Sequence, residues 1–597
     1  MLVYGDRDRI EDPRVVVARI AAACPTAAAK PDGLIRHSLL VSLFIEAAEL
    51  AQGLADAEFA ALGEDDRTPC RDAATAVVME LARAVARSWR GEPQPGACTL
   101  VAGLATLSKQ PLPETVRIRR PEGYAFYGLY PEAYLEAAAR LPPDLPAPFV
   151  VIGLRSIGTG LAAMAAVALS AAPPVTLRPI GHPFHRAVRV SARQRAALLA
   201  DAGASYVIVD EGPGLSGSSF GAVAEWLETA GVPSRRIAFL PSHGGDPGPR
   251  SSDRHRRRWA EAVRPVIGFD ELVHAAHGPV PPLERWFEDT LGPAVAPLRD
   301  LSGGAWRTAS ADLAADWPPV HAQQERRKFL LRTASGSWLL KFSGLGRLGE
   351  VKLDRARTLH QAGFTTEPIA LRHGFLAERW LDGAQPPFTM SPKRLADYLL
   401  FRARSFPAER DMGASLPDLL AMAHVNIGEA LGAAATVSLD RWTPGTLREL
   451  GAGVRRVVTD NRLHIWEWLR TTDGRLLKTD SLDHADAHDL IGCQDIAWDV
   501  AGAIVEFGLA AAEAARLCGA VGASKRLVAF HLPCYLAFQI GYWSFASSNA
   551  GAASMRRFYE RAWKRQASLG GVPYLLPAPH NHRFEHHLQT LSPGQSS

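Results

Sequence analysis

The chain has 597 residues, too many for one hydrophobic core, which predicts a multidomain protein. With 47% hydrophobic and 21% charged residues, its composition excludes a disordered or fibrous chain. The 66 basic residues nearly balance the 62 acidic ones, and a net charge of +4 argues against a broad nucleic-acid-binding surface.

The cysteines and the N-terminus indicate the compartment. Six scattered cysteines lack CxxC or Cys/His spacing, so they predict neither a zinc site nor a disulfide framework and favour a reducing cytoplasm. The charged start MLVYGDRDR has no apolar core of a signal peptide. Ser156 to Ala172 is the best candidate for a membrane span, but it is rich in Gly and Ala and shorter than about 20 residues. We therefore expect a cytoplasmic protein that inserts into no membrane.

The first half of the chain contains two kinds of pattern. Residues 1–135 show apolar positions at helical spacing, as in LLVSLFIEAAEL, which predicts a mostly helical segment. Residues 136–275 contain the apolar strands PFVVIGL, SYVIVDE and RIAFLPS, separated by turns and helices. Such repeated strand–turn–helix units predict an α/β domain with a parallel sheet. A linker is expected at residues 276–300.

The second half predicts an α+β organisation. KFLLRTASGSWLLKF is typical of a hairpin, GEVKLDRARTLHQAG of a helix, and PIALRHGFLAERW of a strand pair. The remainder is largely helical apart from a second hairpin, LHIWEWLRTTDGRLLKTD. These patterns predict a smaller lobe at residues 301–385, a larger lobe at residues 386–575 and a flexible tail at residues 576–597.

A phosphate-binding motif follows the strand VIVDEGPGLSGSSF. Asp210 and Glu211 end the strand, and a Gly/Ser loop leads into a helix. Ligands bind beyond the carboxyl ends of parallel strands, where loop N–H groups and the helix N-terminus hold a phosphate. The two acids would accept hydrogen bonds from sugar hydroxyls. The predicted phosphate-binding residues are Gly214, Ser216, Gly217, Ser218 and Ser219.

This motif resembles the fingerprint of the type I phosphoribosyltransferase family over about residues 120–275. The earlier turn in VIGLRSIGTGLAA is similar to the family's pyrophosphate loop, at Arg155, Ser156 and Gly158. Between the two turns, LRPIGHPFHRAVRV supplies Arg186 and other cations where the family has a mobile basic loop. The two turns come in the family's order.

The resemblance implies a site for phosphoribosyl pyrophosphate (PRPP) and Mg²⁺, where pyrophosphate is displaced through an oxocarbenium-like state. It implies catalytic roles for Asp210, Glu211 and Arg186. The second acid is Glu rather than the commoner Asp, and Gly-Pro-Gly makes the loop about one residue longer than usual. A generic α/β turn, or a site for another phosphate compound, stays open.

A lysine and two acids mark a second site. Lys341 lies in an apolar strand, so its burial requires an anionic partner, and Glu350 at the start of the next helix is the nearest one. Asp460 and Asp480 each end an apolar stretch. This order resembles the aminoglycoside-phosphotransferase-like branch of the protein-kinase-like fold, over about residues 300–570.

That resemblance implies a bilobal ATP-dependent kinase domain. Lys341 would orient the ATP phosphates, Asp460 would position the acceptor hydroxyl, and Asp480 would hold Mg²⁺. The segment LAERWLDG, around Glu378, is similar to the hinge that receives adenine.

Several features depart from that family. Ile465 stands where the family has a metal-binding Asn, so Glu467 is either a substitute ligand or an ordinary hairpin residue. SGG at residues 302–304 is too short to count as a Gly-rich phosphate loop. The run DHADAHD fits a transition-metal site or, as we prefer, an activation-segment-like loop. The C-terminal HNHRFEHH fits a metal-binding tract or, as we prefer, a mobile tail.

Together these patterns predict a bifunctional transferase acting on small molecules. One site would use PRPP, and the other would use ATP to phosphorylate a nucleoside-like compound, both with Mg²⁺. Two alternatives stay open: a PRPP-sensing regulatory protein with an inactive kinase-like module, and a kinase acting on protein or RNA. A homo-oligomer is compatible with the sequence, which fixes neither the acceptors nor the pathway.

Overall fold

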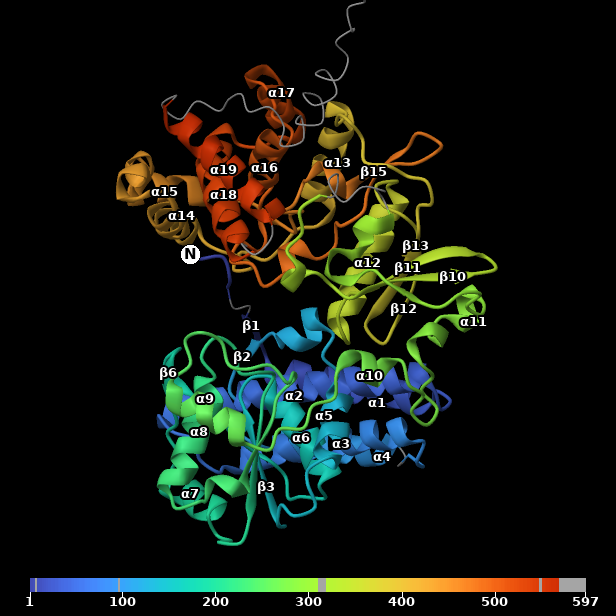
Figure 1. Ribbon diagram of the computed structural model, residues 1–597, viewed down its shortest axis with the longest axis vertical. Helices are drawn as coiled ribbons and strands as arrows, with labels where there is room; N and C mark the ends of the chain where they lie inside the picture. Colours follow the sequence, from blue (N-terminus) through green and yellow to red (C-terminus); the bar gives the residue numbers. More distant parts are fainter. Residues whose placement is uncertain (6–7, 95–96, 310–317, 547–549, 569–597) are drawn as a thin grey trace, which may run out of the picture.

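The computed structural model describes residues 1–5, 8–94, 97–309, 318–546 and 550–568. It is a mixed α/β structure with a helical N-terminal segment, as the sequence predicts. Figure 1 shows two bodies, with the parallel sheet and the N-terminal helices in the lower one and most of the C-terminal half in the upper one.

Four helices begin the lower body. Their apolar stripes pack against one another and against the parallel sheet, because helical spacing places those residues on one face. In the described part of the chain, the second helix alone is long and apolar enough to cross a membrane, and 78% of its most apolar window is buried inside the protein. The helices are α1 (Pro13–Ala28), α2 (Leu34–Leu62), α3 (Pro69–Arg90) and α4 (Ala97–Ser108).

A four-stranded parallel sheet follows, in the order β4-β3-β7-β8. Alternate residues face opposite sides, so Val207 packs towards the N-terminal helices and Ile208 towards α8. The strands are β3 (Phe149–Leu154), β4 (Val175–Leu177), β7 (Ser205–Val209) and β8 (Ile237–Leu240). The helices are α5 (Pro131–Ala139), α6 (Gly158–Ala168), α7 (Ala192–Leu198), α8 (Ser218–Thr229) and α9 (Asp253–Glu261).

Smaller elements surround this sheet. The expected membrane-span candidate forms only the 11-residue helix α6. The short elements are β5 (Ile180–His182), β6 (His185–Ala187), the π-helical turn η1 (Gly123–Tyr127), α10 (Phe269–Val273) and α11 (Glu288–Leu291).

The C-terminal half begins with a five-stranded antiparallel sheet in the order β12-β13-β11-β10-β9. Both predicted strand pairs form, because their alternating apolar residues face α12 and the core. The elements are β9 (Arg299–Asp300), β10 (Lys328–Thr333), β11 (Gly336–Phe342), α12 (Arg347–Gln361), β12 (Pro368–Arg372) and β13 (Phe375–Arg379).

The upper body continues as a helical layer with its own core. Its helices are α13 (Pro392–Ser405), α14 (Leu416–Leu431), α15 (Pro444–Ala452), α16 (Ala497–Glu506), α17 (Ala511–Val521), α18 (Lys525–Phe545) and α19 (Ala550–Ser568). Its short strands are β14 (Arg456–Val457), β15 (Trp468–Arg470), β16 (Leu476–Lys478) and β17 (Gln494–Asp495). The predicted second hairpin is β15–β16, whereas the predicted tail at residues 576–597 lies outside the described residues.

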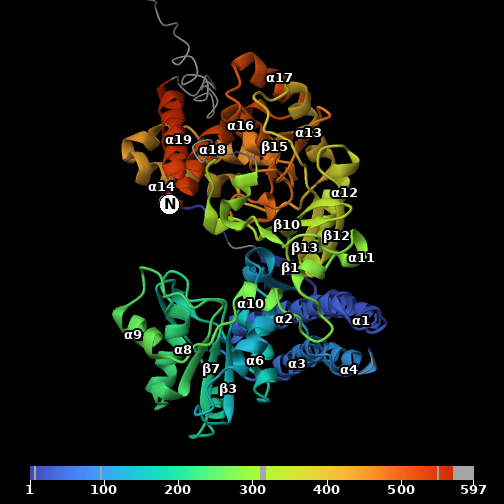
Figure 2. The same ribbon diagram turned by 45° about the vertical axis from the view of Figure 1, so that its right-hand side comes forward.

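The two bodies are joined by a common hydrophobic core. One core contains Phe44 of α2, Val207 of β7 and Phe375 of β13, so it joins the N-terminal helices, the parallel sheet and the antiparallel sheet. The first residues lie beside α14 in both views (Figures 1 and 2), where the Leu2 N–H donates to Asn426. The chain then enters the lower body as β1 (Asp8–Glu11), paired with β2 (Val116–Arg119). The domain boundaries stay a prediction.

Candidate functional site

Two predicted loops meet at the carboxyl edge of the parallel sheet. Asp210 and Glu211 follow β7, and Arg155 and Ser156 follow the neighbouring strand β3. A cavity of about 240 Å³ lies there. It is lined by Asp8, Arg119, Arg120, Glu122, Arg155, Ser156, Ile157, Asp210, Glu211 and Gly212.

The two acids are half-buried in the cavity wall. The Asp210 carboxylate accepts a hydrogen bond from the Glu211 N–H at 2.9 Å, and the Glu211 carboxylate accepts one from the Gly123 N–H at 3.1 Å. Burial raises the pKa of Asp210 to about 7. Burial, together with the negative charges of Glu122 and Asp210, raises the pKa of Glu211 to about 8. Both acids therefore titrate near neutral pH, as acids at functional sites often do.

The Gly/Ser loop is closely packed against its neighbours. Gly217 has φ 63°, and a Cβ there would lie 2.3 Å from His255 Nε2, so only glycine fits. The hydroxyls of Ser216 and Ser218 both donate to the Pro183 carbonyl, at 3.0 and 2.7 Å. Pro183 lies in the turn between β5 and β6. The predicted basic loop is therefore a hairpin that packs against the Gly/Ser loop.

The other predicted residues of this site have different positions. Gly158 begins α6, where a Cβ would lie 2.7 Å from a carbonyl oxygen of β7. Gly214 is exposed, and Ser219 is half-buried in the first turn of α8. Arg186 donates to the Gly181 carbonyl within the hairpin and is not among the residues lining the cavity.

Arg155 forms ion pairs with two acids that the sequence analysis did not single out. Its side chain is fully buried, 2.8 Å from the carboxylate of Asp56 and 2.6 Å from that of Asp65. Arg178 also donates to Asp56, at 2.9 Å. Burial would raise the pKa of Asp56, but Arg178 and Arg155 lower it. The guanidinium of Arg155 thus fastens α2 to the sheet, while the residue's backbone lies at the cavity.

We expect the double variant D210N/E211Q to be more stable than the wild type at pH 8. In the unfolded chain both acids ionise near pH 4, whereas their raised folded pKa values delay ionisation until about pH 7 and 8. The wild type therefore loses stability as the pH rises from about 5 to 8, and the amides do not. Melting temperatures across this range check the prediction. A constant difference at all pH values would contradict it.

Lys341 of β11 forms the centre of the second site. Its ammonium lies 2.5 Å from Asp480 and 3.1 Å from Asp483. The predicted pairing with Glu350 does not form, because Glu350 is exposed on α12. The same helix instead contributes another buried cation, Lys352, whose ammonium lies 3.5 Å from the Asp483 carboxylate.

The charges of this site stabilise one another. Burial alone would lower the pKa of Lys341, but Asp480 and Asp483 raise it above its usual value. Burial alone would raise the pKa of Asp480, but Lys341 and His484 hold it well below the usual range. Glu378, near the end of β13, is buried too, and burial raises its pKa to about 7 although Lys341 opposes the shift. The Lys341–Asp480 pair is therefore ionised at neutral pH.

Hydrogen bonds to Asp499 hold the loop of Asp460 in place. The backbone N–H groups of Asp460 and Asn461 donate to the carboxylate of Asp499 on α16, at 2.7 and 2.9 Å. His484 Nδ1 lies 3.0 Å from the Asp460 carbonyl oxygen, and its Nε2 lies 3.5 Å from Asp480. One imidazole thus links the two acids that the sequence predicted for this site.

Glu467 has a cationic partner already. Lys478 is fully buried, with its ammonium 2.8 Å from Glu467 and 3.6 Å from the Asp460 carboxylate. Ile465, at the position predicted for a metal-binding Asn, offers no side-chain ligand. A carboxylate oxygen of Glu467 does lie within 4.8 Å of a carboxylate oxygen of Asp460 and of a ring nitrogen of His484. A fixed ammonium therefore neutralises the carboxylates that a second divalent ion would bind.

The acids of the run DHADAHD form ion pairs around this site. These acids contact cations from several elements instead of converging on one point. The pairs are Asp483 with Lys341 and Lys352, Asp486 with Arg355, and Asp489 with Arg462.

We expect R402K to destabilise the protein by about 2–4 kcal/mol and to lower activity at this site. The buried Arg402 donates to the carbonyls of Val458, Thr459 and Ser481, so it holds both the loop before Asp460 and the loop after Asp480. A lysine cannot reach all three acceptors. Urea unfolding measures the loss. The exposed neighbour variant R404K on the same helix is the control, and an equal effect in both would contradict the prediction.

The two sites share a wall around η1. Glu122 lines the first cavity, and its carboxylate contacts the His488 ring. Tyr127, at the other end of this segment, lines a second cavity of about 40 Å³ together with Asp480. Glu211 contacts the same segment from the parallel-sheet side. The segment from Glu122 to Tyr127 therefore borders both cavities.

Comparisons with known proteins give partial likenesses. No protein-family model matches the chain, and no curated protein does. A choline/ethanolamine kinase family protein from Mesorhizobium loti is 18% identical and has a TM-score of 0.29, covering 45% of this chain and 94% of its own. The choline kinase LicA from Streptococcus pneumoniae is 13% identical with the same TM-score of 0.29, covering 40% and 89%. A spectinomycin phosphotransferase, solved with ADP and spectinomycin, is 14% identical with a TM-score of 0.27, covering 40% and 85%. At such TM-scores these likenesses to kinases identify no activity for this chain.

Proposed function

We propose that the C-terminal site transfers the γ-phosphoryl group of ATP to a small molecule. The observation that carries this proposal is the ion pair between the buried Lys341 and the half-buried Asp480, next to the loop of Asp460 that Asp499 holds. In phosphoryl transfer a lysine positions the nucleotide phosphates, one acid holds Mg²⁺, and another orients the acceptor hydroxyl. We assign these roles to Lys341, Asp480 and Asp460, and place the adenine near Glu378.

The donor set suits Mg²⁺. Asp480 offers carboxylate oxygens, which Mg²⁺ prefers, and its side chain is 27% exposed, so part of it is accessible. When bound, the ion would neutralise negative charge on the nucleotide phosphates. Asp483 would keep Lys341 paired while Asp480 turns to the ion. Because Glu467 is already paired with Lys478, Asp480 is the principal ligand in this proposal.

ATP binding at this site would require an opening motion. The cavity beside Asp480 measures about 40 Å³, whereas ligand pockets usually enclose about 300–1,000 Å³. The antiparallel sheet carries Lys341, and the helical layer carries Asp460 and Asp480. We therefore expect these two parts to separate when the nucleotide enters and to close again for chemistry.

We further propose that the first cavity binds PRPP with Mg²⁺ and transfers its phosphoribosyl group. Asp210 and Glu211 would accept hydrogen bonds from the ribose hydroxyls, and the loop at Gly217 would hold the 5-phosphate. Arg119 and Arg120 line the cavity and would stabilise the leaving pyrophosphate. The observation behind this second function is that Arg155 and Ser156 after β3, and Asp210, Glu211 and Gly212 after β7, line one cavity, whereas Gly214 to Ser219 lie further along the second loop.

Together these sites would form a cytoplasmic two-site enzyme for small, nucleoside-like molecules, in which one product feeds the other site. The test is to incubate the purified chain with ATP, PRPP, Mg²⁺ and a panel of bases and nucleosides, and to follow ADP and pyrophosphate. Release of both products in an acceptor-dependent manner supports the proposal. Binding of both compounds without turnover would favour the alternative, a PRPP sensor with an inactive kinase-like module.

A further inference from the structure

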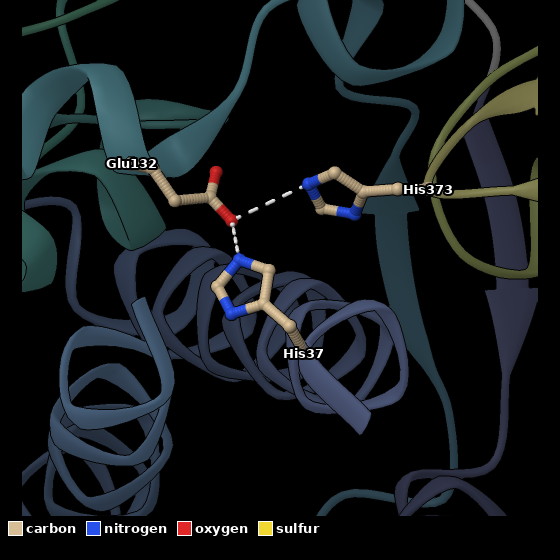
Figure 3. A group of neighbouring side chains, drawn as sticks. All are labelled: His37, Glu132 and His373. Atoms are coloured by element: carbon tan, nitrogen blue, oxygen red, sulfur yellow. Dashed lines mark hydrogen bonds and ion pairs between the residues drawn. The ribbon is translucent and has the colours of Figure 1, made fainter. Parts of the chain in front are cut away.

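Two histidines and one glutamate meet in the interior, away from both sites described above. His37 lies on α2, Glu132 on α5 and His373 in the turn between β12 and β13. Figure 3 shows both imidazoles pointing towards the Glu132 carboxylate. The exposed fractions are 0% for His37, 0% for Glu132 and 2% for His373. The three elements belong to the N-terminal helices, the layer beside the parallel sheet and the antiparallel sheet.

Hydrogen bonds leave this group incompletely satisfied. His37 Nε2 lies 2.7 Å from Glu132 Oε1, and His373 Nε2 lies 3.6 Å from the same oxygen. Both ring nitrogens of His373 and Glu132 Oε2 have no hydrogen-bond partner. Burying such groups unpaired costs about 1–3 kcal/mol each. The cluster therefore contains residue types that bind metals, and several of its polar atoms lack the hydrogen bonds that a purely structural cluster would make.

The spacing suits a small, tetrahedrally coordinated cation. Ligand atoms at about 2.0–2.1 Å from a tetrahedral ion lie about 3.3 Å apart, and the observed separations of 2.7 and 3.6 Å from Glu132 Oε1 bracket that value. The relevant atoms of all three residues lie within 4.8 Å of one another. Two imidazoles and one carboxylate form a donor set that zinc uses in proteins.

The protein holds the His373 ring in place. His373 has φ 42°, a conformation that residues other than glycine rarely adopt. Its carbonyl accepts a hydrogen bond from the Tyr130 hydroxyl at 2.9 Å, and its ring packs edge-on against Trp286. The same aromatic surroundings exclude competing polar partners.

We propose that His37, Glu132 and His373 bind one Zn²⁺ ion, which fastens the N-terminal helices to the antiparallel sheet. Binding would displace the proton between His37 and Glu132 and would give His373 Nε2 a partner. The ion would be structural, because the site is enclosed and lies apart from the two candidate cavities, neither of which these residues line. Its effect would be on folding stability and on the rigidity of the junction.

The test uses the full chain with the four tail histidines, His580, His582, His586 and His587, replaced by alanine. This removes the His-rich segment as a competing ligand. The protein is stripped with a chelator, then titrated with Zn²⁺ in excess Mg²⁺ so that carboxylate sites for Mg²⁺ are filled. We expect the parent to bind one more Zn²⁺ per chain than the H373N variant, and only the parent to melt at a higher temperature with zinc.

The variants separate metal loss from simple damage. Asparagine tolerates the positive φ at position 373, and H37Q and E132Q remove the other two ligands independently. H531N is the matched control, since His531 is equally buried with both ring nitrogens unpaired but belongs to no such cluster. With Co²⁺ in place of Zn²⁺, the visible absorption should be lost in H373N and kept in H531N. The proposal is wrong if the stripped parent takes up no zinc, or if the H373N, H37Q and E132Q variants that fold bind as much as the parent.

Discussion

Replacing Asp480 by asparagine lowers kcat for phosphoryl transfer from ATP by at least about a hundredfold. Asparagine keeps the side-chain shape but removes the charge that would hold Mg²⁺, and leaves Lys341 with Asp483 as its remaining acidic partner. The same change lowers stability at neutral pH, because the folded-state pKa of Asp480 lies well below its usual value. That contribution is present above about pH 4 and is lost in acid, so the two proteins should converge at low pH.

An ADP-release assay at saturating ATP measures the first effect. D354N is the control, since Asp354 is an exposed acid on α12 and its loss changes the net charge equally. PRPP affinity should be unchanged in both variants. Full ATP-dependent activity in a folded D480N protein would show that the assignment of the kinase-like site is wrong.

The variants D210N and E211Q each lower phosphoribosyl transfer by about tenfold to a hundredfold, and the double variant loses more. A hydrogen bond to a charged group contributes about 1.5–3 kcal/mol, and about 1.4 kcal/mol corresponds to a factor of ten. Each amide would still contact the ribose but without the charge. Transfer in the wild type should also rise between about pH 6 and 8, as these two acids ionise.

Pyrophosphate release measures this reaction, with E225Q on the exposed face of α8 as the control. Because the pH–stability prediction above concerns the same residues, loss of transfer should accompany gain of stability at pH 8. Loss of transfer together with a gain of stability distinguishes a functional role from structural damage. Transfer that survives in D210N/E211Q, or is lost equally in E225Q, would contradict the assignment.

Local patterns in the sequence predicted much of the fold. The parallel strands, the β10–β11 and β15–β16 hairpins and α12 form where alternation, turn residues and helical spacing place them. Asp210 and Glu211 follow β7, and Asp480 comes soon after β16, because each ends an apolar strand that the sequence pattern indicates. Their chemical roles stay predictions.

Long-range partners were beyond the sequence. Lys341 requires an anion, but the one it contacts, Asp480, is 139 residues away and not the nearby Glu350. The helical spacing of α12 does not reveal which of its faces lies next to Lys341. In the structure that face contains Lys352, which contacts Asp483. Likewise, His37 and Glu132 are 95 residues apart, so ligand-spacing rules for short motifs do not detect them.

The shared wall gives a physical route for communication between the sites. The segment from Glu122 to Tyr127 contacts Glu211 on one side and lies at the cavity of Asp480 on the other. Coupling of this kind must be reciprocal in binding free energy, so any effect of PRPP on ATP affinity should equal the effect of ATP on PRPP affinity.

Calorimetric titration of the wild type, D210N and D480N with ATP and, separately, PRPP, each with Mg²⁺, tests the two-site proposal most directly. We predict that the wild type binds one equivalent of each compound, that D480N greatly weakens ATP binding alone, and that D210N weakens PRPP binding alone. If the wild type bound neither compound, or if each variant lost both, the proposal of two separate nucleotide-chemistry sites would be wrong.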